Sequence, residues 1–201
     1  SPGTPAGEML RRYWWPVAFS EAVKAKGAPV KVKLLAEEFA LFRDGVGQLG
    51  LVALHCSHRG TSLEYGRVED NGIRCCYHGW LYDIQGNCLE QPAEPGDSTF
   101  KERIKHPAYR AHDAAGLIFA YVGPEPVPML PSYDLLVRED GCRVVGGDEE
   151  NCNWLQRAEN SADGAHSIAL HAAGYPNMAL KRPTIKWEPT RFGIKETTWV
   201  E

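Results

Sequence analysis

Two short stretches of this chain each combine a cysteine with a histidine: Cys56-Ser-His58-Arg-Gly and Cys75-Cys-Tyr-His78-Gly-Trp. We call them the first and the second clip. Their ligand spacings are Cys-x-His and Cys-x-x-His, and a glycine stands close behind each histidine. A residue without a Cβ allows backbone N–H groups to approach a bound group closely. Two thiolates and two imidazoles therefore reach one place from two loops, which predicts a metal centre.

The mixed composition of each clip favours an iron–sulfur cluster. In a Rieske [2Fe–2S] centre two cysteines hold one iron and two histidines hold the other, which matches Cys56, His58, Cys75 and His78. Neutral imidazole ligands raise the reduction potential above that of an all-cysteine cluster. A structural Cys₂His₂ zinc site is the alternative, but zinc fingers usually place both cysteines in one clip and both histidines in the other. The residues predict a protein that carries electrons.

Other side chains beside the clips are not assigned as ligands. His55 lies outside the Cys-x-His spacing and is expected to be a strand side chain. Cys76 lacks the interval to the second histidine, and we expect it to be buried without binding metal. Tyr77, Trp80 and Tyr82 are expected to pack around the cluster rather than line a substrate site.

Composition sets modest bounds on the function. The chain has 201 residues, 43% hydrophobic content and a net charge of −4, which gives no reason to expect nucleic acid as a partner. No stretch reaches the apolar length of a membrane span, and the N-terminus does not resemble a signal peptide. The six cysteines show no disulfide pattern. A reducing cytoplasm is the expected compartment.

Short strands dominate the first part of the chain. A helix is predicted over residues 8–15, ended by Pro16. Alternating and apolar runs then predict strands over 30–35, 39–42, 49–54, 72–77 and 117–122, with a hairpin over 82–89. Strands of this length and spacing indicate an all-β sandwich that carries the clips at two loop tips.

A proline-rich segment, 123–131, is predicted to be a stiff linker and a domain boundary. Beyond it, residues 153–171 predict a helix in pieces, and 184–188 and 193–201 predict two strands joined by a turn. We therefore expect an N-terminal helical segment at 1–28, a cluster-binding domain at 29–123 and an α+β domain at 124–201.

The predicted helical pieces hold a second group of polar side chains. His166 and His171 lie roughly 140° apart on an ideal straight helix, so they share a metal only if the helix bends or breaks. Two ordinary polar helix residues are the alternative. Glu159, Asn160 and Asp163 crowd the same segment, and metal-bound histidines usually donate their second N–H to a carboxylate or carbonyl. Two histidines and a carboxylate bind Fe(II) and leave positions open for O₂ and substrate.

The order of the two clips, the proline-rich linker and Asn-Trp…Glu-Asn-x-x-Asp-x-x-His-x₄-His resembles the oxygenase component of Rieske non-haem iron oxygenases. The opening Gly-Thr-Pro-Ala-Gly-Glu-Met-Leu-Arg-Arg-Tyr-Trp-Trp-Pro-Val-Ala is similar to the phthalate dioxygenase and aromatic O-demethylase branch. The resemblance covers nearly the whole chain. It implies a Rieske sandwich followed by the start of a helix-grip catalytic domain.

The resemblance also implies roles for the residues that match its motifs. Cys56, His58, Cys75 and His78 would hold the [2Fe–2S] cluster. His166 and His171 would be two ligands of a mononuclear Fe(II). Asp163 matches a carboxylate that links an iron-bound histidine to a Rieske histidine of the neighbouring subunit, and Asn160 matches a polar residue near the iron. A homotrimer and an NAD(P)H-dependent reductase as electron donor follow from the same resemblance.

One departure concerns the third iron ligand, which in this family is usually an Asp far downstream of the second histidine. No Asp follows His171 in this chain. Either the catalytic domain is truncated or the carboxylate is missing. The chain stops at Glu201 inside a predicted strand, with no cap or turn, which favours truncation.

The function implied is an oxygenase that uses O₂ and reductase-supplied electrons to hydroxylate, or to O- or N-demethylate, an aromatic substrate, as in aromatic hydrocarbon catabolism. The alternative is a Rieske-type electron carrier without a catalytic iron of its own. The missing carboxylate favours that alternative, but it leaves His166, His171 and Asp163 unexplained. A zinc-stabilised binding module is the third possibility, against which the ligand order argues.

Overall fold

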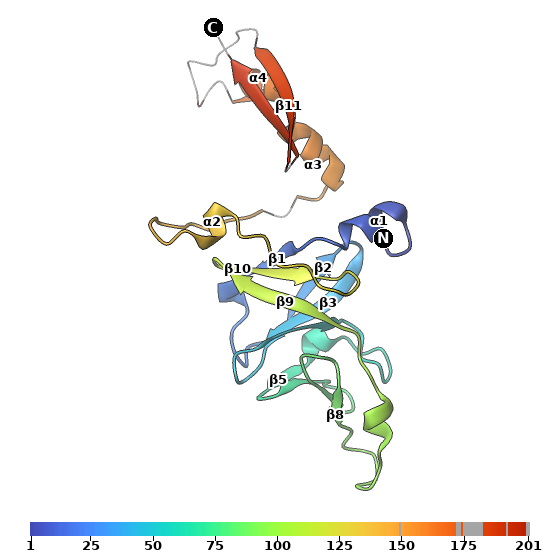
Figure 1. Ribbon diagram of the computed structural model, residues 1–201. Coiled ribbons are helices and arrows are strands. Elements are labelled where there is room, and N and C mark those ends of the chain that lie inside the picture. The colour runs from blue at the N-terminus through green and yellow to red at the C-terminus, as the bar shows by residue number, and fades with distance from the viewer. Residues whose placement is uncertain (149, 172–173, 175–182, 192, 200–201) are drawn as a thin grey trace. The chain divides into compact units, whose positions relative to one another are not determined.

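The structure is a computed structural model that describes residues 1–148, 150–171, 174, 183–191 and 193–199 (Figure 1). The chain separates into two compact units, Ser1–Gly146 and Gly147–Glu201, which we call the first and the second unit. We describe each unit by itself. The first is built almost wholly of antiparallel strands, and the second combines two helices with a strand pair.

The N-terminal helix differs from the prediction. Helix α1 spans Pro5–Leu10, begins at a proline, and is capped by the Thr4 hydroxyl, which accepts from the Gly7 N–H at 3.1 Å. The chain then turns, and Trp15–Phe19 forms strand β1. The predicted helix over 8–15 is therefore confirmed only at residues 8–10, and the prediction that it continues to residue 15 and is ended by Pro16 is wrong. Pro16 lies inside an edge strand, where the missing N–H is tolerated.

Six antiparallel strands form the larger sheet of the first unit, in the order β1-β10-β9-β4-β3-β2. The strands that join β1 are β2 (Val30–Leu34), β3 (Glu37–Arg43), β4 (Leu49–Ala53), β9 (Ala108–Ala114) and β10 (Leu117–Tyr121). The strands predicted over 30–35, 39–42, 49–54 and 117–122 are confirmed. Because β1 pairs with β10, the N-terminal segment is part of this sheet.

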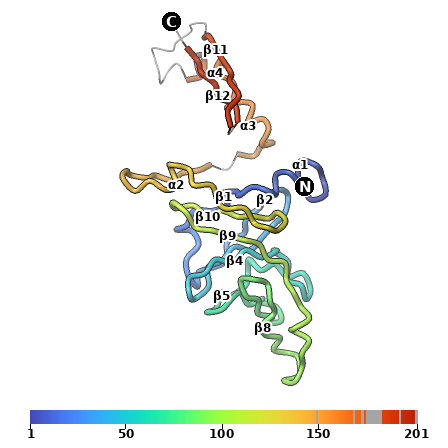
Figure 2. Tube along the Cα trace, viewed as in Figure 1, coloured from blue at the N-terminus to red at the C-terminus, as the bar shows by residue number. Residues whose placement is uncertain are grey.

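A smaller antiparallel sheet, in the order β5-β6-β7-β8, holds the region around the second clip. Its strands are β5 (Arg67–Glu69), β6 (Gly72–Arg74), β7 (Leu81–Tyr82) and β8 (Cys88–Glu90). Short 3-10 turns at Ser20–Ala22, Leu63–Tyr65 and Phe100–Arg103 complete the first unit. The chain trace runs from the larger sheet into this smaller one and back through β9 (Figure 2).

Strand β3 separates two hydrophobic cores, because successive side chains of a strand point to opposite faces. Phe39 and Leu41 pack with Leu51 and Ile118 in one core. Ala40 and Phe42 belong to the other core, which also contains the buried clip cysteines and Tyr82. The second core thus positions the clips.

No helix or strand lies between β10 and helix α2 (Asp134–Val137), as predicted for the proline-rich segment. The second unit contains α3 (Trp154–Ser161), α4 (Gly164–Leu170), and the antiparallel pair β11 (Thr184–Thr190) and β12 (Gly193–Trp199). The predicted broken helix and strand pair are confirmed over the described residues, residues 200–201 of the second predicted strand lie outside them, and the fold is α+β.

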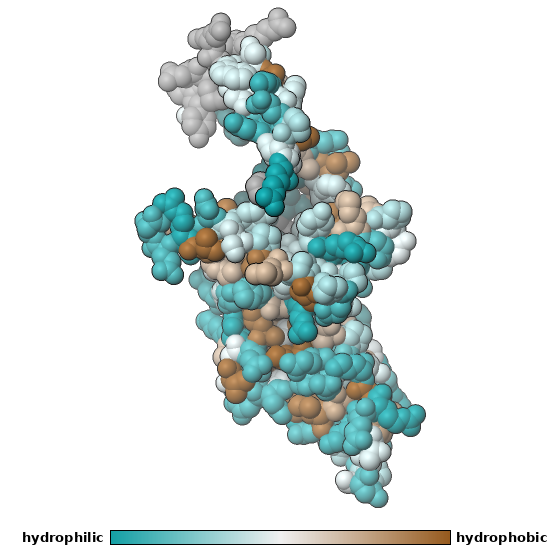
Figure 3. All heavy atoms as spheres, viewed as in Figure 1, coloured by the Kyte–Doolittle hydropathy of each residue, from teal (hydrophilic) through white to brown (hydrophobic). Residues whose placement is uncertain are grey.

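The surface drawn in Figure 3 is mostly polar, and few of the described residues of the second unit are buried. The face of the molecule drawn in Figure 3 is largely hydrophilic with scattered hydrophobic residues. Among the described residues of the second unit, only Gly164 is buried. Within the described part of the chain, no helix has the length and apolar character that crossing a membrane would require.

Candidate metal centres

The two clips share the same backbone hydrogen bonds. In each, the cysteine N–H donates to the carbonyl five positions on, at 2.9 Å. The glycine four positions on donates back to the cysteine carbonyl, at 2.8 Å in the first clip and 3.1 Å in the second. These glycines, Gly60 and Gly79, have φ values of +72° and +74°, a left-handed conformation that glycine adopts without strain. The matched turns present each cysteine and histidine in a similar way.

The four predicted ligands come together as a cysteine pair and a histidine pair. Cys56 and Cys75 are each 3% exposed, and their thiols are near enough to interact. The rings of His58 and His78 meet edge to face, with centroids 4.5 Å apart. Among the residues that the structure describes, no three Cys, His, Asp or Glu side chains surround a single point. The pair-and-pair arrangement is the one that a cluster with differently ligated irons uses.

The chemistry of these side chains fits a bound iron–sulfur cluster. The Nδ1 atom of His58 is buried and makes no hydrogen bond within the described residues, which is unusual for a buried polar atom that binds nothing. Burial lowers the pKa of His58, and repulsion from His78 adds to this, so the imidazole stays neutral, as a metal ligand must. Burial raises the pKa of the Cys56 thiol, an effect that a bound iron would overcome.

Aromatic side chains surround the clips. The Trp80 indole, 5% exposed, stacks on the His58 ring with centroids 4.5 Å apart and 7° between the planes. The hydroxyl of the buried Tyr82 lies 3.2 Å from Cys56 Sγ. Both residues pack around the clips as expected. Tyr77 contacts the His78 ring at a centroid distance of 3.9 Å but is 64% exposed, so its ring covers the site from the solvent side.

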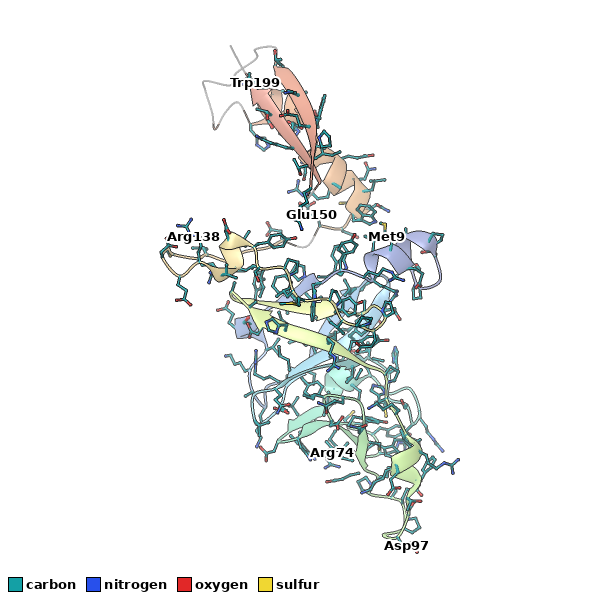
Figure 4. All side chains as sticks on the ribbon, viewed as in Figure 1. Met9, Arg74, Asp97, Arg138, Glu150 and Trp199 are labelled. Atoms are coloured by element: carbon teal, nitrogen blue, oxygen red, sulfur yellow. The ribbon has the colours of Figure 1, made fainter. Side chains whose placement is uncertain are left out.

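A charged group holds the second clip. The Arg74 guanidinium donates to the Gly79 carbonyl at 2.7 Å and pairs with Glu69 and Glu90. Arg74 itself is the last residue of β6 in the smaller sheet, where Figure 4 labels it. The hydrogen bond from Arg74 lowers the pKa of Glu69 to about 2, against the opposing effect of burial. Arg74 therefore links the turn of the second clip to β5 and β8.

Two predictions beside the clips need correction or refinement. Cys76 is exposed, so the prediction that it is buried is wrong: the strand predicted over 72–77 ends as β6 at Arg74, and Cys76 lies in the solvent-facing turn that follows the buried Cys75. His55 forms an isolated bridge with Ser62, and its Nδ1 lies 3.0 Å from the Gly60 carbonyl, where it supports the turn of the first clip. All six cysteines are free.

Sequence analysis missed Arg74 and His106, which contact the clips from outside their motifs. His106 is fully buried, and its Nδ1 lies 2.7 Å from the hydroxyl of Ser57 in the first clip. Neither residue belongs to a spacing pattern, because their partners are fixed by the fold. A histidine immediately before Pro107 at the start of a strand gives no signal that separates it from a surface residue.

The second unit brings its two predicted histidines together. Helix α4 ends at Leu170, and His171 caps it with φ −96° and ψ 2°, outside helical geometry. This is the break that the straight-helix argument requires. The rings of His166 and His171 then lie 5.5 Å apart between centroids, at 68°. His166 Nδ1 is buried beside the Asp163 carboxylate, an arrangement that is common behind metal-bound imidazoles.

Asp163 and Asn160 lie close to these histidines. Asp163 caps α4 by accepting from the Ala165 N–H at 2.9 Å, and its other carboxylate oxygen lies 3.5 Å from His166 Nδ1. Asn160 and His171 line a common cavity of about 430 Å³. The predicted residues of the second unit thus converge, although Asn160 and Asp163 are exposed in this chain.

Comparison with known families identifies the first unit. Residues 13–108 match the Rieske [2Fe-2S] domain. The cofactor of this domain is a [2Fe–2S] cluster, and the zinc alternative is set aside.

Curated relatives extend the similarity into the second unit. The chain is 45% identical over 205 residues to the tert-butanol monooxygenase / tert-amyl alcohol desaturase oxygenase subunit of Aquincola tertiaricarbonis, covering 94% of this chain and 43% of the relative. It is 46% identical over 185 residues to the phenoxybenzoate dioxygenase alpha subunit of Ectopseudomonas oleovorans, covering 85% and 45%. The chain thus spans less than half the length of these relatives.

Solved structures agree with the fold. Dicamba monooxygenase bound to dicamba matches with a TM-score of 0.78 over 94% of this chain and 56% of that chain, at 21% identity, which shows the fold alone. The reduced complex between oxygenase and ferredoxin in carbazole 1,9a-dioxygenase matches with a TM-score of 0.53, at 32% identity, over 60% of this chain and 31% of that chain.

The relatives include oxygenase subunits of a phthalate dioxygenase and an O-demethylase. This chain belongs to the oxygenase (alpha) components of the Rieske non-haem iron oxygenases, in the branch of phthalate dioxygenase and the aromatic O-demethylases.

Proposed function

We propose that the chain is part of an oxygenase component that uses O₂ and reductase-supplied electrons to hydroxylate, or to O- or N-demethylate, a small aromatic substrate. The observation that carries this proposal is the presence of two separate ligand groups in one chain. The clips gather two cysteines and two histidines, and the end of α4 gathers His166 and His171. An electron carrier needs only the first group.

In the first unit, Cys56 and Cys75 would hold one iron of the cluster, and His58 and His78 the other. Trp80 fixes the plane of the His58 ring by stacking on it, and the buried core keeps water from the cysteine side. The His78 ring is partly exposed beside Tyr77, so electrons would enter and leave on the histidine side.

In the second unit, His166 and His171 would be two protein ligands of the mononuclear Fe(II). Asp163 orients His166, because its carboxylate lies beside Nδ1 of that ring while it also caps the helix. It would also link His166 to a Rieske histidine of a neighbouring subunit, and Asn160 would contribute a polar group beside His171. When bound, the two metal groups together supply single electrons and activate O₂.

This assignment implies a division of the chain and a ligand beyond it. We place the N-terminal segment at 1–28, the cluster domain at 29–123 and the start of the catalytic domain at 124–201. Since the chain spans 43% of one curated relative and 45% of another, the third iron ligand is proposed to be a carboxylate that this chain does not contain.

The proposed partners follow from the relatives. A ferredoxin or an NAD(P)H-dependent reductase would dock on the cluster domain, as the carbazole 1,9a-dioxygenase complex contains a ferredoxin. A cytoplasmic homotrimer would place each cluster near a neighbouring iron. One relative is named for an aliphatic alcohol, so substrate panels should contain tertiary alcohols beside aromatic acids and aryl ethers.

The test is oxygen uptake and product formation by the holoprotein with NAD(P)H and a reductase. His166→Ala should abolish product formation while the cluster is still reduced at the normal rate, because only the second site loses a ligand. Unchanged product formation in that variant would refute His166 as an iron ligand, whereas reduction of the cluster without product in the wild-type holoprotein would refute the oxygenase assignment and leave an electron carrier. A histidine outside both sites, His112 on β9, provides the matched control, and His112→Ala should retain turnover.

A further inference from the structure

We propose that His106 is a positioning residue for the iron–sulfur cluster: through its hydrogen bond with Ser57, it holds the first clip in register with the two sheets. This inference rests on the proposed role of Cys56 and His58 as cluster ligands. His106 lies outside both clips, and its contacts are what suggest the role.

Both ring nitrogens of His106 have partners, although the side chain is fully buried. Nε2 lies 2.9 Å from the Ala53 carbonyl, and Nδ1 lies 2.7 Å from the Ser57 hydroxyl. A carbonyl only accepts, so Nε2 carries the proton and donates. Burial lowers the pKa of His106 and keeps the ring neutral, so Nδ1 accepts from Ser57. The hydrogen bond therefore has a defined direction.

Because of the position of Ser57, this hydrogen bond can affect both proposed ligands of the first clip. Ser57 stands between Cys56 and His58, so a restraint on its side chain restrains both proposed ligands. Ala53 ends β4, the strand that leads into the first clip. The two hydrogen bonds of the His106 ring therefore connect the end of that strand to the middle of the first clip.

His106 also contacts the smaller sheet. Its ring stacks on the Tyr82 ring, with centroids 4.6 Å apart and 28° between the planes, and the Tyr82 hydroxyl reaches Cys56 Sγ. Its backbone N–H donates to the Gly86 carbonyl at 2.8 Å, and Gly86 lies so close to the His106 carbonyl that a Cβ there would collide with it. His106 thus connects both sheets to Ser57 of the first clip, beside the direct contact between Tyr82 and Cys56.

The second clip is held differently. Its turn is fixed by the partly exposed, charged Arg74, whereas the first is fixed by a buried neutral ring. Removing a hydrogen-bonded group behind a metal ligand typically weakens metal binding by about 10- to 100-fold. We therefore expect removal of the Ser57–His106 hydrogen bond to weaken cluster binding by the first clip, although all four ligands are unchanged.

The most conservative test is Ser57→Ala, which removes the donor and leaves the core intact. We expect cluster bleaching in the presence of a chelator to be about tenfold faster, together with a shifted reduction potential. Ser62→Ala is the matched control, because the Ser62 hydroxyl bonds to Glu64 in the same loop region without touching His106. A Ser57→Ala variant whose bleaching rate and reduction potential both equal those of the wild type would overturn the proposal.

Two amide substitutions separate the bonds of the ring. In His106→Asn the side-chain oxygen can take the place of Nδ1 and accept from Ser57, whereas His106→Gln keeps only a donor near Ala53. We expect His106→Gln to bleach as fast as Ser57→Ala and to shift the potential with the same sign, and His106→Asn to bleach more slowly than His106→Gln. Equal rates for the two amides would contradict a role through Ser57.

The double variant Ser57→Ala/His106→Gln completes the cycle. If both residues act through one bond, the double variant bleaches no faster than either single variant. If the fold-increases in bleaching rate of the two single variants multiply in the double variant, Ser57 and His106 act separately. Failure of the proposed ligand assignment gives a different result, since the wild-type chain would then bind no cluster and no bleaching could be measured.

Discussion

The first unit buries its two cysteine ligands in a packed core, whereas the second presents its two histidines at a helix end with a single buried residue among those described. Both clips are tied to the core by side chains that the fold brings from outside the motifs. His166 and His171 are brought together by the end of α4 and oriented by Asp163. If the proposed function holds, the first unit supplies all four protein ligands of its cluster, and the second supplies two of the ligands of the mononuclear iron.

The largest expected effect breaks the first site alone. Cys75→Ala should remove both irons and both sulfides of the cluster, because a buried ligand is lost and no described side chain replaces it. Cys76→Ala is the matched control, since Cys76 is adjacent but exposed, and it should leave iron, sulfide and the visible spectrum unchanged. Loss of the cluster in the Cys76 variant would mean that the ligand is misassigned.

A second substitution tests whether the two sites are coupled through Asp163. Asp163→Asn keeps the size and the helix cap but removes the charge beside His166. In the full oxygenase, which supplies the third iron ligand, both metal centres should remain loaded, while product formed per O₂ consumed should fall at least tenfold. Simultaneous iron analysis and oxygen uptake measure this. Normal coupled turnover in the asparagine variant would exclude the bridging role.

The difference in packing predicts a difference in stability. Leu51 is fully buried in the first unit, and Leu51→Ala should lower the free energy of unfolding by about 2 to 5 kcal/mol. Ile194 of the second unit is 77% exposed, and Ile194→Ala should change the free energy by less than about 0.5 kcal/mol. Urea titration of this chain checks both values, and similar losses at the two positions would contradict the comparison.

The smallest expected effect concerns the ion pair between Glu69 and Arg74, which fixes the turn of the second clip. The pKa of Glu69 is lowered from its usual 4.5 to about 2, chiefly by the hydrogen bond from Arg74. A lowered folded-state pKa stabilises the fold above the unfolded value, so this stability is present above about pH 4.5 and is lost as the pH falls towards 2. Because Glu69 is partly exposed, we expect its charge to contribute only about 1 to 2 kcal/mol to the free energy of unfolding.

Melting of the wild type and of Glu69→Gln between pH 2 and 6 measures this contribution. The variant should melt lower than the wild type at pH 6, and the two should converge near pH 2. A constant difference across the range would show that Glu69 does not stabilise the second clip through its charge.

Much of the first site could be predicted, because ligand type and spacing are local properties of the sequence. The clips, the strands around them and the broken helix bearing His166 and His171 are all visible in this way. Cys76 was misjudged because strand β6 ends at Arg74 and Cys76 lies in the exposed turn of the second clip. Pro16 was read as a helix end because its edge-strand position depends on β10, about a hundred residues away. His106 was missed because its partners Ala53 and Ser57 are neighbours only in the folded chain.

The most direct test of the central claim is iron and acid-labile sulfide per chain after anaerobic reconstitution, measured together with zinc. The account predicts two irons and two sulfides held by the clips, with a red-brown colour, and their loss in Cys75→Ala but not in Cys76→Ala. A third iron would show that the second site is also occupied. One zinc per chain without sulfide would contradict the assignment of the clips as a Rieske centre.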